Sequence, residues 1–338
     1  MSETKKYTFK DFKSDQEVRW CPGCGDIAIM SSIQKAMAEM GIPKEDFAIV
    51  SGIGCSSRFP YYMNTYGFHG IHGRAGAIAS GVKTANPKLS VWQITGDGDA
   101  LAIGGNHFIH EIRRNIDLNV VLFNNQIYGL TKGQYSPTSE YGIKTKTSPY
   151  GTVEKPFNPG ELVIGAGGTF FARGIDNNVK ENQELFMEVE KHKGISIVEV
   201  LQNCVIFNDG VYSYLTDRKE KADRQLFVEH GKPMIFGKEK DKGLVLENGK
   251  LKVVKIGENG ITEADILVHD AKEQSPIMHY QLAALQYPEF PIVLGVIRAV
   301  ELTTYDEAVH AQIEEVKASS KIKCMDDLLH SGSTWEVE

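Results

Sequence analysis

Short apolar runs rich in β-branched residues alternate, along the first two thirds of the chain, with longer segments whose apolar residues recur every three to four positions. The short runs predict strands at residues 47–51, 93–95, 120–123, 169–172 and 195–200. The longer segments predict helices at residues 27–40, 75–84, 104–114, 159–167 and 179–192. Because strands and helices alternate, the pattern favours an α/β fold with a doubly wound, mostly parallel sheet.

The two ends of the chain follow a different pattern. Residues up to Arg19 are mostly polar and are expected to form an extended arm, after which Asp26 is the expected N-cap of the first helix and Gly41 its stop. Beyond Cys204 the chain becomes densely charged, and Asn248-Gly249 predicts a hairpin turn. A helix at 276–286, a strand at 292–297 and a helix at 306–319 follow. We therefore predict a first domain of residues 1–209 and a C-terminal α+β extension of residues 210–338.

Two neighbouring strands of this pattern end in polar residues. Gly96-Asp97-Gly98-Asp99 follows one strand, and Asn124-Asn125-Gln126-Ile127 ends the next. Since ligands bind at the carboxyl ends of parallel strands, Asp97 and Asn125 are expected at the same edge of the sheet. The glycines allow a ligand to approach the backbone closely, and the amides that follow Asp97 can face phosphate oxygens where the next helix begins.

This edge also suits a hard cation. Mg²⁺ prefers oxygen ligands and commonly shares phosphate groups with the protein. The Asp97 carboxylate, the Asn125 side-chain oxygen and the Ile127 carbonyl would supply three ligands, and a diphosphate could supply two more.

The spacing of these residues resembles a known family signature. Gly-Asp-Gly, followed about one helix and one strand later by Asn-Asn, is similar to the fingerprint of the thiamine-diphosphate (TPP) enzymes. The resemblance implies Mg²⁺ on Asp97, Asn125 and the Ile127 carbonyl, with the cofactor beside Gly96, Gly98 and Asp99. Gly-Asp-Gly alone would more simply be a turn at a polar strand end.

Composition limits the other classes of function. The chain has 338 residues, 41% hydrophobic and 24% charged, as in an ordinary globular protein. A formal net charge of −7 argues against sequence-independent binding to nucleic acid, which requires a basic face. The amino-terminal stretch of residues 1–10 has no apolar run of signal-peptide length, and no run of about 18 apolar residues follows. A cytoplasmic protein without a membrane segment is expected.

Four of the five cysteines lie where such a sheet would bring them together. Cys21 and Cys24 form a C-x-x-C pair before the first helix, and Cys55 and Cys204 each follow a predicted strand. A thioredoxin-like motif would follow an apolar strand, haem attachment would need a histidine in place of Gly25, and a structural zinc site usually has a second close pair. Thiolates from scattered loops suit a [4Fe–4S] cluster.

Taken together, residues 20–209 resemble the β subunit of the 2-oxoacid:ferredoxin oxidoreductases. The similarity rests on Cys-Pro-Gly-Cys-Gly from Cys21, Gly-Ile-Gly-Cys-Ser-Ser-Arg from Gly52, His-Gly-Arg-Ala from His72, Gly-Asp-Gly-Asp-Ala from Gly96, Asn-Asn-Gln-Ile-Tyr-Gly-Leu-Thr-Lys-Gly-Gln from Asn124, and Asn-Cys-Val-Ile-Phe-Asn-Asp from Asn203. It implies that Cys21, Cys24, Cys55 and Cys204 hold the cluster. It also implies that the cofactor is lined by Ile53, Gly54, Cys55, Ser56, Gly129 and Leu130. Cys324 matches no position of this pattern.

The resemblance also implies a reaction and its partners. A 2-oxoacid would be decarboxylated oxidatively with coenzyme A (CoA), giving an acyl-CoA, CO₂ and reduced ferredoxin, while the protein orients and tunes its cofactors. The glutamate that contacts the cofactor's pyrimidine is expected on a separate α subunit. The chain alone is therefore not expected to be active.

The 2-oxoacid is predicted from two cationic loop residues. Arg58 and Lys132 could contact the two carboxylates of 2-oxoglutarate, and Leu130-Thr131-Lys132 is similar to the 2-oxoglutarate-type members. Arg58 replaces a lysine of some broad-specificity relatives, so pyruvate or broad specificity stays an alternative. His72 is a further candidate catalytic residue, and His69 and Arg74 are candidates to approach the diphosphate or substrate.

Two other classes stay open at this stage. One is a non-redox TPP enzyme with a structural zinc, and the other is a non-enzymatic iron–sulfur scaffold. The visible spectrum separates zinc from an iron–sulfur cluster, and Mg²⁺-dependent TPP binding argues against the scaffold.

Overall fold

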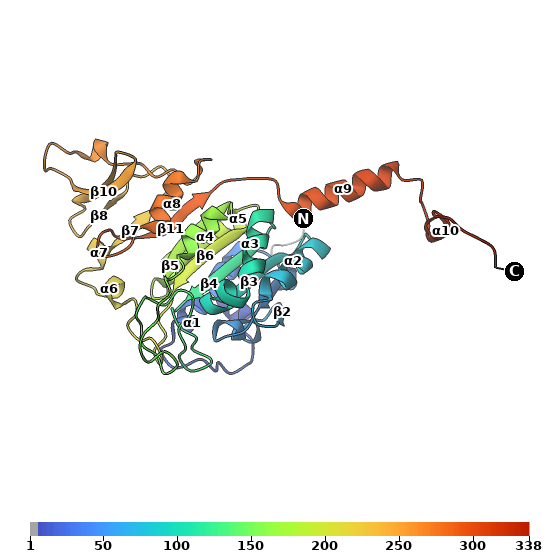
Figure 1. Ribbon diagram of the computed structural model, residues 1–338, viewed down its shortest axis with the longest axis horizontal. Helices are drawn as coiled ribbons and strands as arrows, with labels where there is room; N and C mark the ends of the chain where they lie inside the picture. Colours follow the sequence, from blue (N-terminus) through green and yellow to red (C-terminus); the bar gives the residue numbers. More distant parts are fainter. Residues whose placement is uncertain (1–5, 338) are drawn as a thin grey trace.

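The computed structural model describes residues 6–337, which are built around one eight-stranded sheet (Figure 1). The strand order is β2-β1-β3-β4-β6-β5-β11-β7, and every pair is parallel except β5 with β11. The strands are β1 (Phe47–Ser51), β2 (Tyr66–His69), β3 (Ser90–Gly96), β4 (Asn119–Asn124), β5 (Phe170–Ile175), β6 (Ser196–Leu201), β7 (Gln225–Val228) and β11 (Ile292–Ala299). The predicted mostly parallel α/β sheet is confirmed.

Helices cover both faces of the sheet, because its central strands are apolar on both sides. On one face, α1 (Gly25–Met40) and α5 (Val179–Lys191) enclose a core that contains Ile33, Trp92 and Phe186. On the other, α2 (Ala75–Ala85), α3 (Gly105–Arg114), α4 (Pro159–Gly165) and α8 (Ile277–Ala284) enclose a second core around Phe108 and Leu282. The predicted helices of both layers are present, with ends within a few residues of those expected.

The start of α1 differs from the prediction. Cys24 occupies the N-cap position, while Asp26 lies inside the first turn and is 1% exposed, so Asp26 as N-cap was wrong. Gly41 ends the helix in the left-handed region at φ 72°, as expected. The prediction of an extended arm before Arg19 was also wrong in part, since the 3₁₀ turn Phe9–Phe12 buries Phe12 against Phe47. Residues 1–5 of the amino-terminal stretch lie outside the described residues.

Three further 3₁₀ turns and one π-helical turn lie between helices and strands of the described residues. The 3₁₀ turns are Lys44–Asp46, Ser56–Tyr62 and Glu263–Asp265, and the π-helical turn is Asp99–Ile103. This π turn leads directly from the Gly96-Asp97-Gly98 segment into α3. It therefore sets the course of the chain at the carboxyl edge of the sheet.

Residues after 209 contribute to the main sheet as well as forming a small sheet of their own. Strands β7 and β11 complete one end of the eight-stranded sheet. The small sheet has the order β10-β9-β8, with β8 (Ile235–Phe236), β9 (Lys242–Glu247) and β10 (Lys250–Lys255). The expected hairpin turn lies at Asn248 and Gly249, both with positive φ. Short helices α6 (Ser213–Thr216) and α7 (Lys221–Arg224) precede β7.

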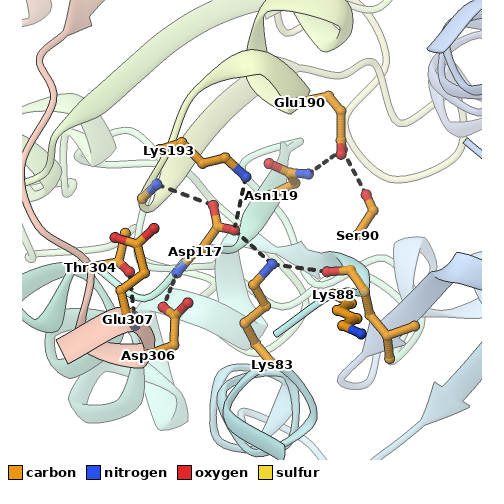
Figure 2. Close-up of polar contacts among 12 residues, drawn as sticks. Lys83, Lys88, Ser90, Asp117, Asn119, Glu190, Lys193, Thr304, Asp306 and Glu307 are labelled. Atoms are coloured by element: carbon orange, nitrogen blue, oxygen red, sulfur yellow. Dashed lines mark hydrogen bonds and ion pairs between the residues drawn. The ribbon is translucent and has the colours of Figure 1, made fainter. Parts of the chain in front are cut away.

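The last helices, α9 (Tyr305–Ser319) and α10 (Met325–Leu329), extend away from the sheet (Figure 1). The start of α9 is anchored at the amino ends of the strands, where Asp306 accepts a 3.1 Å hydrogen bond from the Asp117 amide (Figure 2). The buried Lys83 ammonium lies 2.6 Å from the Asp117 carboxylate and donates to the Leu89 carbonyl. This anchor is at the edge opposite the polar strand ends. Among residues 6–337, none of the helices has the length and apolar content needed to cross a bilayer.

Candidate functional site

A hollow of about 150 Å³ lies at the carboxyl edge of β1, β3 and β4. It brings together residues that are far apart in the sequence because the parallel strands all end at this edge. All the residues predicted to bind the cofactor line it, together with His72: Ile53, Gly54, Cys55, Ser56, Gly96, Asp97, Gly98, Asp99, Asn125, Ile127, Gly129 and Leu130. Tyr128 and Thr131 also line it and were not predicted.

Asp97 is buried at the floor of this hollow, with 3% of its surface exposed. The hydroxyls of Ser136 and Thr138 both donate to its Oδ2, at 2.5 Å and 2.6 Å. Burial raises the pKa of Asp97 to about 6, and the two hydroxyls oppose that rise. The backbone amides of Gly98 and Asp97 also stabilise the charged form, and neither hydroxyl occupies Oδ1, so Oδ1 is the oxygen that a cation in the hollow would approach.

Asn125 and Ile127 reach the same hollow through a tight turn at the end of β4. Gln126 between them has φ 56°, and the Asn125 Oδ1 accepts a 3.1 Å hydrogen bond from the Ile127 amide. Asn208 donates to the Asn125 carbonyl at 3.0 Å and fixes the turn from outside. The turn therefore presents both predicted magnesium ligands on the side of Asp97.

Tyr128 closes one wall of the hollow over Gly98. Its hydroxyl donates a 2.9 Å hydrogen bond to the Gly98 carbonyl, and a Cβ at position 98 would overlap the tyrosine ring. Burial, followed by the charges of Asp97 and Asp99, raises the pKa of Tyr128 to about 12. The Tyr128 hydroxyl therefore stays neutral and donates its proton to the Gly98 carbonyl. Position 98 requires glycine because any side chain there would overlap the Tyr128 ring.

Asp99 lines the hollow but directs its oxygens to protein groups. Its Oδ1 accepts hydrogen bonds from the amides of Ile53 and Gly73, at 3.1 Å and 2.7 Å, and lies 2.6 Å from the His72 Nδ1. Its Oδ2 accepts from the Thr95 hydroxyl at 2.8 Å. A carboxylate only accepts, so the His72 Nδ1 donates and the imidazole orientation is set by Asp99. His72, whose side chain is 38% exposed, lies beside the hollow.

The cysteines gather next to this hollow. A Cβ on Gly129 would lie 3.5 Å from both the Cys55 and the Cys204 Sγ, so the two thiols lie against the Gly129 backbone, which lines the hollow. Burial, then the Asp26 charge, raises the pKa of Cys24, which also feels Cys204 and Cys55. Burial raises the pKa of Cys55 to about 12, with contributions from Cys204 and Cys21. These mutual effects place the four sulfurs in one neighbourhood.

The thiols are not arranged for a single ion. Among residues 6–337, no three His, Cys, Asp or Glu side chains are grouped closely enough to hold one metal ion. All five cysteines are free thiols. Cys324 is exposed at the N-cap of α10, in the part of the chain beyond α9.

The remaining predicted residues lie at or beyond the rim. Arg58 and Lys132 are not in the lining of the hollow, and neither has an ion-pair partner within the described part of the chain. Arg58 lies near both Cys55 and His69: burial raises the pKa of Cys55 and the Arg58 charge opposes that rise, whereas burial, then the Arg58 charge, lowers the pKa of His69. Arg74 donates to the Gly73 and Ile103 carbonyls, outside the hollow.

Four residues of the site were missed from the sequence: Ser136 and Thr138, which hold Asp97, Tyr128, which covers Gly98, and Thr131, which lines the hollow. All four follow β4 within the long irregular segment that ends at Asn158. A segment of that length in a compact domain is usually functional, and its Ser-Pro-Thr-Ser run at residues 136–139 is the signal that could have found them.

Comparisons with known proteins agree with this geometry. A family model described as "Thiamine pyrophosphate enzyme, C-terminal TPP binding domain" matches residues 52–200. The chain is 48% identical over 333 residues to the 2-oxoglutarate oxidoreductase subunit KorB of Mycobacterium tuberculosis, covering 97% of this chain and 88% of that one. It is 45% identical over 199 residues to subunit beta of 2-oxoacid:ferredoxin oxidoreductase 2 of Aeropyrum pernix, covering 59% and 64%.

One solved structure matches nearly the whole chain. It is the 2-oxoglutarate:ferredoxin oxidoreductase from Magnetococcus marinus, with 2-oxoglutarate, coenzyme A and succinyl-CoA bound. The TM-score is 0.78 and the sequence identity is 31%, over 98% of each chain. The match therefore includes the residues after 209 as well as the region of the hollow.

Proposed function

The chain belongs to the β subunits of the 2-oxoacid:ferredoxin oxidoreductases, and from this membership we propose that it oxidises 2-oxoglutarate together with an α subunit. CoA is the acyl acceptor, ferredoxin is the electron acceptor, and the products are succinyl-CoA and CO₂. One observation carries the proposal. The hollow that collects Asp97 and Asn125 shares Gly129 and Cys55 with the cysteine neighbourhood.

The residues of the hollow fit TPP and Mg²⁺. Asp97, Asn125 and Ile127 supply oxygen donors only, which is the ligand chemistry of Mg²⁺. Asp97 is buried without a cationic side chain bound to it among the described residues, and a bound cation would offset the cost of keeping it charged. Gly54 leaves its backbone open beside the hollow, because nothing lies within 4 Å of a Cβ placed there, and a diphosphate could approach it closely.

The four cysteines fit a [4Fe–4S] cluster better than a zinc ion. A zinc site requires four ligands within about 2.3 Å of one point, and the described residues form no such group. A cluster spreads its four thiolate ligands over a larger volume and accommodates loops that start at Cys21, Cys55 and Cys204. Thiols that are raised in pKa by burial become thiolates only when metal binds, as expected for cluster ligands.

When bound, the thiazolium of TPP supplies the electron sink for decarboxylation, and the cluster supplies one-electron acceptance. The residues of this chain perform the positioning. Asp97 and Asn125 would hold the metal that binds the diphosphate end, and Tyr128 keeps the Gly98 loop closed by its hydrogen bond to the carbonyl. His72, oriented by Asp99, offers its second ring nitrogen to the hollow as a donor or acceptor for the substrate.

The α subunit is proposed to complete the site. The hollow offers oxygen ligands for a metal ion, and that ion would bind the diphosphate. The glutamate that contacts the cofactor's pyrimidine is expected on the partner subunit. Beside it, β2 is an edge strand whose four residues are all exposed, including Tyr66 and Phe68. An exposed edge strand with aromatic side chains is a surface that a partner subunit would cover.

For the substrate, Arg58 and Lys132 are the proposed contacts. Both are cations at the rim without an ion-pair partner in the described residues, and Lys132 follows the lining residues Leu130 and Thr131. Two cations suit the dianion 2-oxoglutarate, whereas pyruvate would need one. Pyruvate or broad 2-oxoacid specificity is the alternative.

The decisive experiment uses the α and β subunits produced together and loaded with TPP, Mg²⁺ and iron–sulfur. Reduction of a viologen by 2-oxoglutarate with CoA, at least tenfold more efficient than with pyruvate, is the expected result. Equal or preferred use of pyruvate would reject 2-oxoglutarate as the substrate. A colourless protein that contains zinc and no iron would reject the redox reaction altogether.

A further inference from the structure

A buried carboxylic acid that the proposed reaction does not use lies behind the Asp99–His72 pair. Glu111 on α3 is 2% exposed, and its Oε1 accepts a 3.1 Å hydrogen bond from the Gln93 Nε2 on β3. The other oxygen, Oε2, has no hydrogen-bond partner, and neither has the Gln93 Oε1. Within residues 6–337 no cationic side chain forms an ion pair with Glu111.

One of these two residues, Gln93, lines a small cavity, and the Glu111 Oε2 lies against Gly76 in the wall of the same cavity. The cavity has a volume of about 10 Å³, and its lining includes Gly76, Gln93, Thr95 and Asp99. A Cβ on Gly76 would overlap the Glu111 Oε2, so the carboxyl group reaches the wall of α2 where that glycine lies. A volume of roughly 10–15 Å³ accommodates one water molecule when two to four polar partners surround it.

The donors and acceptors at this cavity define how such a water would bind. A neutral Glu111 donates from Oε2 to the water, and the water then donates to the Gln93 Oε1 and to the Asp99 Oδ2. Asp99 has the capacity, because Oδ2 accepts only the Thr95 hydroxyl in the structure. An ionised Glu111 would instead face Gln93 Oε1 as a second acceptor. Burial raises the pKa of Glu111 to about 8, which agrees with the neutral form.

We propose that one buried water molecule bridges Glu111, Gln93 and Asp99, and that Glu111 is thereby a positioning residue for the Asp99–His72 pair. Glu111 contacts neither the hollow nor any reacting group, and it acts through Asp99. The water gives Asp99 a further donor on the side away from His72, which keeps Oδ1 directed at the imidazole Nδ1 and the Gly73 amide. The consequence for catalysis rests on the proposed function, whereas the water and its effect on His72 do not.

The water is tested first, by a high-resolution crystal structure of the full chain in complex with its α subunit. The expected result is a single water within hydrogen-bond distance of Glu111 Oε2, Gln93 Oε1 and Asp99 Oδ2. An empty cavity, in a map that shows other buried waters, would overturn the proposal.

The positioning role is tested by ¹⁵N NMR of the histidine rings in the full chain, with His72 assigned from a His72→Gln variant. Glu111→Gln retains a donor and an acceptor and should leave the His72 ring signals unchanged. Glu111→Leu removes both and should shift them. Equal spectra for Glu111→Leu and the parent chain, or equal shifts in Glu111→Gln and Glu111→Leu, would overturn the role.

A pair of glycine variants provides the matched control, and it also serves if Glu111→Leu does not fold. Gly76→Ala places a methyl group against the Glu111 carboxyl, whereas Gly81→Ala makes the same change on the same helix in open space. Gly76→Ala should shift the His72 signals and Gly81→Ala should not. A shift in both variants or in neither contradicts the proposed link.

The catalytic consequence is measured in the loaded αβ complex. Glu111→Leu should lower kcat roughly three- to tenfold, about the effect of one hydrogen bond, with KM within twofold and with Glu111→Gln restoring the parent rate. A kcat for Glu111→Leu equal to the parent value would overturn the positioning role. If the parent complex oxidises no 2-oxoacid, the proposed function fails, while the crystal and NMR results still decide the water and its link to His72.

Discussion

The hydroxyl of Thr138 donates a 2.6 Å hydrogen bond to the carboxylate of Asp97, although 41 residues separate them in the chain. The same Thr138 oxygen lies 2.9 Å from the Asn124 side-chain oxygen, at the end of β4, so both acceptors compete for its one proton. One hydroxyl therefore joins the ends of two adjacent strands, which carry the proposed magnesium ligands. The irregular segment after β4 fixes the metal site from behind.

Removing this hydroxyl should weaken cofactor binding. Thr138→Val keeps the shape but leaves Asp97 with one fewer donor, and a hydrogen bond to a charged group contributes roughly 1.5–3 kcal/mol. We expect TPP affinity in the presence of Mg²⁺ to fall about ten- to a hundredfold, measured by titration calorimetry on the αβ complex. Thr147→Val is the control, because Thr147 is exposed in the same segment. Equal affinities in the two variants would mean that Thr138 has no part in the site.

The cysteine assignment predicts a spectroscopic loss. Cys55→Ser and Cys204→Ser each remove one of the two thiols beside Gly129, so both should lose most of the iron and the visible absorption of the cluster. Cys324→Ser should retain both, because Cys324 is exposed beyond α9. Iron analysis and absorption spectra of anaerobically purified complex measure this. Full iron content in Cys204→Ser would remove that residue from the ligand set.

Substrate recognition predicts a difference between two acids. Arg58→Gln and Lys132→Met each remove a charge-assisted hydrogen bond to the 2-oxoglutarate dianion, which should lower kcat/KM about ten- to a hundredfold. Only one of the two should also impair pyruvate, which has a single carboxylate. Steady-state kinetics with both acids decides, with cluster content checked because Arg58 lies near Cys55. Unchanged 2-oxoglutarate kinetics in both variants would exclude the two residues from the substrate site.

Most of the site was predictable because it lies at strand ends. The apolar runs before Asp97, Asn125, Cys55 and Cys204 identify four parallel strands, and parallel strands place their carboxyl ends at one edge. Side-chain pairing was not predictable in the same way. The Ser136 and Thr138 bonds to Asp97 span about forty positions and depend on the path of an irregular segment, which has no periodicity to read.

In the fold, too, local sequence patterns were predictable and pairing between distant strands was not. β2 (Tyr66–His69) is not among the predicted strands, because its glycine and exposed side chains lack the alternation of a half-buried strand. Its strand conformation depends on pairing with β1. Likewise, strand 292–297 was expected in an extension, and its place in the main sheet depends on antiparallel pairing with β5 more than a hundred residues away.

Glu111 predicts how stability depends on pH. Its pKa in the folded chain is raised to about 8 by burial, above the ordinary value of a glutamic acid, so the folded state binds this proton more tightly than the unfolded state. The sign follows from linkage: the folded chain loses stability as pH rises from about 4.5 to about 8, and the loss levels off above that range. Glu111→Gln cannot ionise and should not show this loss.

The measurement is urea unfolding of the parent chain and of Glu111→Gln at pH 5.5, 7 and 8.5. The free energy of unfolding of Glu111→Gln, relative to the parent, should rise with pH by up to a few kcal/mol, since one pKa unit corresponds to about 1.4 kcal/mol. The difference between the two proteins isolates Glu111 from the other buried acids, such as Asp26, because these titrate in both. A difference that stays constant or falls with pH would mean that Glu111 is ionised in the folded chain. An ionised Glu111 has no proton on Oε2 and could not donate the hydrogen bond that the bridging water requires.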